Sequence, residues 1–150
     1  WTAQTFVPLM TGDGAKHVGF TASTASLRTP APPNGLYATT KHASLGVAEG
    51  LASELAAQSI ASTILMPGLF NTDIWDGARA RPERFGGPRR QDPSVSSYWR
   101  EAKSPALMWP HIAAKIDAGG GYLVCATDSG ETRAAYSARA HAILDGLVEI

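Results

Sequence analysis

The chain has 150 residues, of which 44% are hydrophobic and 17% charged, a composition typical of a folded globular protein. Its thirteen basic and thirteen acidic residues cancel, so no broad positive field is available to attract nucleic acid. The single cysteine, Cys125, excludes an internal disulfide, and no stretch approaches the ~20 apolar residues of a membrane span. We therefore expect no nucleic-acid partner, no membrane insertion and a cytoplasmic location.

The first half of the chain alternates between helical and strand patterns. Helical spacing of apolar residues predicts a helix over residues 1–11, and the apolar run "HVGFTAS" predicts a buried strand over residues 17–23. A proline-rich loop follows, and then a helix is predicted from about residue 36 to residue 57. One face of this helix is apolar and expected to be buried: Leu45, Ala48, Ala52 and Leu55. Another face carries only small residues suited to close helix contact: Ala43, Gly46, Gly50 and Ser53.

The alternation continues in the second half. The run "IASTILM", residues 60–66, predicts a second buried strand, and residues 71–103 are too irregular and too rich in arginine, proline and glycine for a regular element. A helix is predicted to begin at Ser104-Pro105 with a kink at Pro110, and "YLVCA" predicts a third strand. Asp128 and Glu131 form a possible capping box for a last helix, whose apolar face would comprise Tyr136, Ala140, Ile143, Leu144 and Leu147. This order predicts an α/β fold with about three parallel strands and helices on both faces.

A tyrosine and a lysine stand four positions apart at the start of the predicted second helix. In "LYATTK", Tyr37 and Lys41 would share one helical face, with the ammonium near the phenol. A neighbouring cation favours the phenolate form, as a tyrosine that transfers protons requires. A solvated lysine on an exposed first turn is the alternative for so short a motif.

Three motifs together resemble the second half of a short-chain dehydrogenase/reductase: "FTASTASL", "YATTK" and "ILMPGLFNTDIW". The resemblance continues through "SPALMWPHIAAKIDAGGGYLV" and covers nearly the whole chain. It implies that the fold is the carboxyl-terminal part of a Rossmann-type doubly wound parallel sheet. Residues 1–150 would then be a partial domain, the catalytic and substrate-binding half, with the dinucleotide-binding half absent from this sequence.

The resemblance also implies catalytic roles. Tyr37 would be the acid/base, Lys41 would support it and bind the nicotinamide ribose, and Ser23 would orient the substrate carbonyl. The family serine usually lies thirteen positions before the tyrosine, which is Thr24 here, whereas Ser23 lies fourteen before. One extra loop residue would account for this, and Thr24 and Ser26 remain possible bearers of the active hydroxyl.

The turn after the second strand, "PGLFNT", resembles the family's segment that holds the nicotinamide carboxamide. Pro67, Gly68, Leu69 and Thr72 would take that role beside Tyr37 and Lys41, although Pro-Gly favours an ordinary turn without any ligand. The glycine-rich "GDG" and "GGG" come before strands, the wrong side for a phosphate cradle, so we interpret both as turns. The four histidines have no metal-ligand spacing, and no metal is assigned.

The implied function is that of an oxidoreductase using NAD or NADP to interconvert a secondary alcohol and a ketone. Leu69, Phe70, Ile74 and Trp75 suggest a small apolar substrate. The family resemblance implies a homodimer or homotetramer for the full-length protein, whereas this fragment alone is expected to be inactive. The alternative is a truncated, inactive paralogue that serves as a dimerisation or interaction module. A hydrolase with Ser23 as nucleophile lacks both a suitable histidine and a nucleophile elbow.

Overall fold

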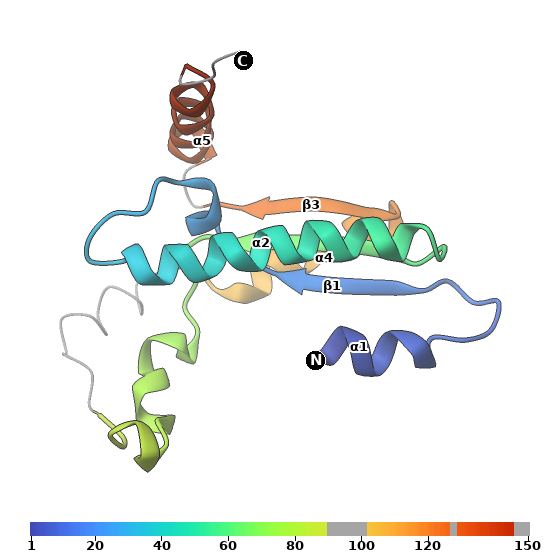
Figure 1. Cartoon of the computed structure of the whole chain (residues 1–150), viewed down its shortest axis with the longest axis horizontal. Helices are drawn as coiled ribbons and strands as arrows, with labels where there is room; N and C mark the ends of the chain where they lie inside the picture. Colours follow the sequence, from blue (N-terminus) through green and yellow to red (C-terminus); the bar gives the residue numbers. More distant parts are fainter. Residues whose placement is uncertain (90–101, 127–128, 146–150) are drawn as a thin grey trace, which may run out of the picture.

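The computed structural model describes residues 1–89, 102–126 and 129–145, apart from the side chains of residues 75 and 76. Three strands form a single parallel sheet in the order β1-β2-β3 (Figure 1). They are β1 (His17–Thr21), β2 (Ala61–Pro67) and β3 (Gly120–Cys125). In register, His17 pairs with Ala61 at the start of β1, and Pro67 pairs with Cys125 at the end of β2. The predicted α/β class with three parallel strands is therefore confirmed.

Helices cover the two faces of this sheet. The long helix α2 (Gly35–Ala56) crosses the front of the sheet in Figure 1, and α4 (Trp109–Asp117) lies behind it. Parallel neighbours require such crossover helices, because each strand must return to the same end of the sheet before the next begins. The outcome is one layer of helix on each side of β2, the central strand.

The core lies between α2 and the sheet. On α2, Ala48 and Leu55 are 2% and 3% exposed, as the apolar spacing predicts, and β2 contributes Ile64 and Met66. The small-residue face of α2 is exposed along its whole length: Ala43, Gly46, Gly50 and Ser53. One helix face is thus used for the core, and the other remains open to solvent.

The amino-terminal helix is shorter than its pattern predicts. The α-helix α1 covers Thr2–Phe6 and gives way to a 3-10 helix, η1 (Val7–Leu9). Pro8 explains the early end, because proline has no N–H for the α-helical bond and clashes with the preceding turn. The first strand is also shorter than the predicted 17–23, since Ala22 and Ser23 lie beyond its last residue, Thr21.

The segment after β2 is more ordered than predicted. The described part contains two 3-10 helices, η3 (Asp73–Ala80) and η4 (Glu83–Phe85), and Phe70 pairs with Lys103 in an isolated parallel bridge. Residues 90–101 of this predicted irregular segment lie outside the described residues.

The third helical segment begins as predicted. The Ser104 side chain accepts a hydrogen bond from the Ala106 N–H at 3.3 Å and caps a 3-10 helix, η5 (Pro105–Met108). The chain then changes from 3-10 to α geometry beside Pro110, where α4 starts, in place of a kink within one helix.

The last helix, α5 (Ser129–Leu144), runs away from the sheet and across the direction of the strands (Figure 1). Three residues of its predicted apolar face are half or more exposed, namely Tyr136, Ile143 and Leu144, so this face is not buried by the described part of the chain. Asp128, half of the predicted capping box, and Leu147 are outside the described residues.

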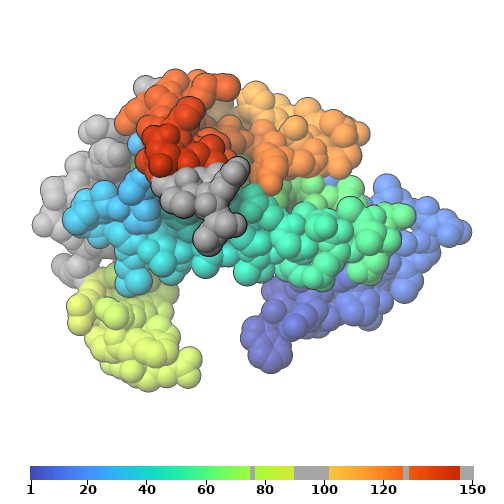
Figure 2. Space-filling view, turned by 45° about the horizontal axis from the view of Figure 1, so that its top comes forward, coloured from blue at the N-terminus to red at the C-terminus, as the bar shows by residue number. Residues whose placement is uncertain are grey.

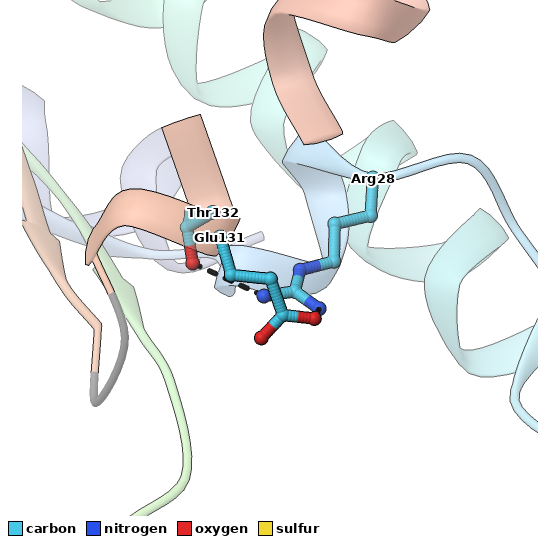
Figure 3. A network of polar contacts seen from close by, with 3 residues as sticks. All are labelled: Arg28, Glu131 and Thr132. Carbon is cyan, nitrogen blue, oxygen red and sulfur yellow. Dashed lines mark hydrogen bonds and ion pairs between the residues drawn. The ribbon is translucent and has the colours of Figure 1, made fainter. Parts of the chain in front are cut away.

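A forked contact ties α5 to the segment that follows β1. Arg28 lies just after the 3-10 helix η2 (Thr24–Leu27), and its guanidinium reaches two neighbouring residues of α5 (Figure 3). One nitrogen lies 3.3 Å from the Glu131 carboxylate, and the other donates to the Thr132 hydroxyl at 3.2 Å. Glu131 thus contacts a residue 103 positions earlier in the chain.

Candidate functional site

The carboxyl ends of the three strands lie at one edge of the sheet and are joined by hydrogen bonds. The Ser23 hydroxyl, two residues past β1, donates to the Pro67 carbonyl at 3.3 Å. The Gly68 N–H, one residue past β2, donates to the Cys125 carbonyl at 2.7 Å. This is the edge where ligands bind in open parallel sheets. It brings Ser23, Pro67 and Gly68, three of the predicted site residues, together.

Tyr37 and Lys41 stand on the first turns of α2, the helix that leaves this edge. The Lys41 ammonium lies 5.9 Å from the centroid of the Tyr37 ring. Tyr37 is 43% exposed, and its hydroxyl makes no hydrogen bond with any described residue, nor does the Lys41 ammonium. The pair is therefore close, on one helical face, and open to a ligand.

The three hydroxyls considered for the carbonyl-orienting role differ in environment. Ser23 is the N-cap of η2, where its Oγ accepts from the Ala25 N–H at 3.2 Å. Ser26 is 1% exposed, and its hydroxyl donates to the Ser23 carbonyl. Thr24, at the first position of η2, is half-buried. Ser26 is the least accessible of the three.

The turn after β2 offers two unused donors. Within the described part of the chain, neither the Leu69 N–H nor the Thr72 hydroxyl has a hydrogen-bond partner, and both residues are half-buried. The polar groups of Pro67 and Gly68 that face the sheet are already used by Ser23 and Cys125. Of these four residues, Leu69 and Thr72 can thus bind a carboxamide through groups that are still free.

Both glycine-rich segments lie at the opposite, amino-terminal edge. Gly12 comes before β1 and has a φ of 87°, a conformation suited to a turn. Gly119 has a φ of 85°, and Gly120 and Gly121 already belong to β3, so only the first residue of "GGG" lies outside the strand. The "GDG" segment is a bend between η1 and β1, and in "GGG" only Gly119 lies in the turn that leads into β3.

Two cavities flank the carboxyl end of β3, one on each face of the sheet. A cavity of about 470 Å³ lies on the α2 side and includes Leu45, Met66, Tyr122 and Tyr136 in its lining. A second, of about 450 Å³, lies on the α4 side and includes Phe70, Lys103, His111 and Cys125. None of the predicted site residues lines either cavity.

The surroundings of α2 are open as well. In the space-filling view the 73–89 segment and the amino-terminal residues leave a recess between them beneath α2 (Figure 2). The exposure of Tyr37 agrees with this openness.

Two side chains near the cavities have altered acidity. Tyr122 donates to the Glu49 carboxylate at 2.7 Å, and this bond, with lesser effects of burial and nearby charge, raises the pKa of Tyr122. Burial raises the pKa of the Cys125 thiol, so little of it is present as the reactive thiolate at neutral pH.

Sequence reasoning missed the residues that join distant segments at this end of the sheet. Arg28, Glu49, Lys103 and His111 have no local pattern that marks them, because their contacts come from other elements. Among the described residues, no group of three or more His, Cys, Asp or Glu side chains could hold a metal ion. None of the described helices has both the length and the apolar character needed to cross a membrane.

A family model described as "short chain dehydrogenase" matches residues 1–83, more than half of the chain. The chain belongs to the short-chain dehydrogenase family. The matched residues include β1, the first turns of α2 and the turn after β2. Family membership does not favour the alternative of a module that is only an interaction partner.

Solved structures of this family share the fold. A protein named as a short-chain dehydrogenase from Novosphingobium aromaticivorans superposes with a TM-score of 0.66 at 23% identity, covering 99% of this chain and 46% of that one. A short-chain dehydrogenase from Streptomyces avermitilis superposes with a TM-score of 0.62 at 20% identity, covering 95% and 52%. No curated protein matches at a significant level. The chain therefore spans about half the length of these two structures.

Proposed function

We propose that this chain carries the reacting centre of an NAD(P)-dependent oxidoreductase that interconverts a secondary alcohol and a ketone. One observation carries the proposal: the Lys41 ammonium lies 5.9 Å from the Tyr37 ring at the carboxyl edge of a parallel sheet. Neither the Tyr37 hydroxyl nor the Lys41 ammonium makes a hydrogen bond with a described residue. A phenol supported by a cation, and free to reach a substrate, suits proton transfer to or from an oxygen atom.

Tyr37, Lys41 and Ser23 have separate roles in this reaction. Tyr37 gives its proton to the carbonyl oxygen during reduction and removes the alcohol proton during oxidation. Lys41 stabilises the phenolate formed in between, because an adjacent positive charge favours the ionised phenol. Ser23 donates a hydrogen bond to the substrate oxygen and so orients it, without losing its proton. Its present bond to the Pro67 carbonyl is long at 3.3 Å, and a hydroxyl can rotate to a new partner.

The residues after β2 fit a nicotinamide carboxamide. The free Leu69 N–H and Thr72 hydroxyl would bind it, with Pro67 and Gly68 shaping the turn and Lys41 and Tyr37 close to the ribose. A bound nicotinamide would supply the hydride acceptor or donor. Thr24, which is half-buried, stays an alternative to Ser23, which is 7% exposed. The Ser26 hydroxyl is less suited, because the residue is 1% exposed and its hydroxyl already donates to the Ser23 carbonyl.

The assembly and setting follow the same proposal. The exposed small-residue face of α2 would allow a second copy to approach closely in a homodimer or homotetramer. The substrate is a small, apolar molecule, and the protein acts in the cytoplasm. Residues 1–150 form the catalytic and substrate-binding half of a longer dehydrogenase domain.

The experiment compares cofactor oxidation by matched lysine variants of the full-length protein. NADH or NADPH consumption is followed by absorbance with a panel of aliphatic and aromatic ketones. Lys41→Met should lower kcat/KM by at least about a hundredfold, the lower range of acid/base contributions. Lys115→Met, on α4, removes the same charge far from Tyr37 in the sequence and should retain nearly full activity. Equal activity of both variants would refute the role of Lys41.

A further inference from the structure

The cavity on the α4 side of β3 has the size and the walls of a small-molecule site. Its volume of about 450 Å³ lies within the ~300–1,000 Å³ range of ligand pockets. Apolar side chains from three separate segments form most of its lining: Phe70, Leu107, Met108, Leu123 and Val124. An apolar part of a ligand could therefore leave water there.

A cationic side chain, that of Lys103, is among the residues that line this cavity. Lys103 and His111 line it, and no aspartate or glutamate is among the described residues of its lining. Lys103 is exposed, so its ammonium can remain hydrated at the mouth while the interior stays apolar. A ligand with an apolar body and a negatively charged end matches this arrangement.

The wall of the cavity is joined to the strand end that carries Ser23 by hydrogen bonds. Cys125 and Ala126 belong to its wall at the carboxyl end of β3, and the Cys125 carbonyl binds the Gly68 N–H at 2.7 Å. Pro67, the residue before Gly68, accepts the Ser23 hydroxyl bond. Two hydrogen bonds thus link the cavity wall to the proposed carbonyl-orienting serine.

We propose that this cavity binds an apolar molecule with a carboxylate end, anchored by Lys103. If the bound molecule is the substrate, which rests on the proposed function, the substrate is an apolar oxo acid or hydroxy acid. The binding of such a molecule is argued from the cavity alone.

Cys125 is the reporter for a test that needs no turnover. It is half-buried in the cavity wall, and mass spectrometry of the peptide that contains it can follow its alkylation by iodoacetamide in the full-length protein. The reaction is run at alkaline pH, because burial raises the pKa of this thiol. The probes are octanoate and octanamide, which share a chain and a shape and differ in charge. Both probes should slow the alkylation of Cys125. Octanoate should give the same protection at an about two- to fivefold lower concentration, which is the difference in affinity that an exposed ion pair provides.

Three variants test whether the Lys103 ammonium itself causes the preference for octanoate. Lys103→Met should remove the preference for octanoate while octanamide still protects, and Lys103→Arg should keep it. Lys115→Met, the same charge change on α4 away from the cavity lining, should behave as the wild type. High salt should reduce the wild-type preference, because it screens an exposed charge.

The outcomes are distinct. Equal protection by the two probes in the wild type, no protection by either, or an unchanged preference in Lys103→Met would overturn the binding inference. If octanoate protects as described and no ketone oxidises the cofactor, the proposed function fails and the binding site stands. If ketones are reduced, 7-oxooctanoate should exceed its methyl ester in kcat/KM by a factor that Lys103→Met abolishes; an equal kcat/KM would overturn the substrate class.

Discussion

The contact of Arg28 with α5 allows a quantitative prediction. The guanidinium donates at 3.2 Å to the hydroxyl of Thr132, a residue 5% exposed, and such a charged hydrogen bond contributes about 1.5–3 kcal/mol when well buried. Because the Arg28 side chain is itself 39% exposed, we take the lower half of that range. The ion pair with Glu131, whose side chain is 65% exposed, adds about 0–1 kcal/mol. Arg28→Ala should therefore lower the free energy of unfolding by about 2 kcal/mol.

Urea denaturation of the full-length protein measures this loss, and hydrogen exchange locates it. Glu131→Gln should lower the free energy of unfolding by about 0.5 kcal/mol or less. Of the two contacts of Arg28, only the ion pair with Glu131 should lose its contribution at high salt. A double-mutant cycle of Arg28→Ala with Thr132→Val should give a coupling of about 1 kcal/mol, and the amides of α5 should exchange faster in Arg28→Ala. If Arg28→Ala and Glu131→Gln cost the same, the Thr132 contact contributes nothing and the reasoning is refuted.

Three further predictions concern the sheet and its edges. Gly120→Ala should destabilise the protein more than Gly121→Ala. Both variants share left-handed strain of about 1–2 kcal/mol, but only a Cβ at Gly120 would clash with the Ser62 carbonyl oxygen, which adds about 1–3 kcal/mol. Equal losses in urea titrations would contradict this. Glu49→Gln should lower the pKa of Tyr122 toward its usual value of about 10, as measured by ultraviolet titration. In the wild type, the hydrogen bond should stabilise the fold below about pH 10, and this stability should be lost as the pH rises through the raised pKa of Tyr122. If the pKa of Tyr122 is the same in Glu49→Gln and the wild type, the hydrogen bond is excluded. Residues 1–150 expressed alone should self-associate, because β1 is an edge strand of the described sheet, and they should bind NAD or NADP weakly. A monomer in light scattering that binds either cofactor with micromolar affinity in calorimetry would show this to be wrong.

The parts of the fold that were predicted correctly depend on local patterns. The apolar runs around Phe20 and Ile64 mark parallel strands, although only β2 has buried residues and β1, at the edge of the described sheet, has none. The helix that begins near Tyr37 follows from the end of the proline-rich loop. The parallel pairing and the cover of helices then follow from the alternation of elements. The early end of α1 was also visible locally, because Pro8 interrupts the pattern, but helical spacing alone overlooked it.

Long-range contacts explain what the sequence could not show. Arg28 meets Thr132 only because α5 returns to η2 after more than a hundred residues, and no periodicity encodes that meeting. Likewise Lys103 reaches the cavity wall through its bridge with Phe70, which depends on the path of the intervening segment. Of the candidate site, sequence predicts the residues that follow strand ends, whereas the choice among Ser23, Thr24 and Ser26 depends on side-chain burial.

The most direct measurement of the central claim is the single-turnover rate of cofactor oxidation by Tyr37→Phe in the full-length protein. Only the Tyr37 hydroxyl is removed, and it has no hydrogen-bond partner among the described residues, so folding and NADPH affinity should be nearly unchanged. We predict a rate at least about a hundredfold below that of the wild type with the same ketone, consistent with acid/base contributions of 10²- to 10⁴-fold. A variant that binds NADPH normally and retains more than about a tenth of the wild-type rate would exclude Tyr37 as the acid/base.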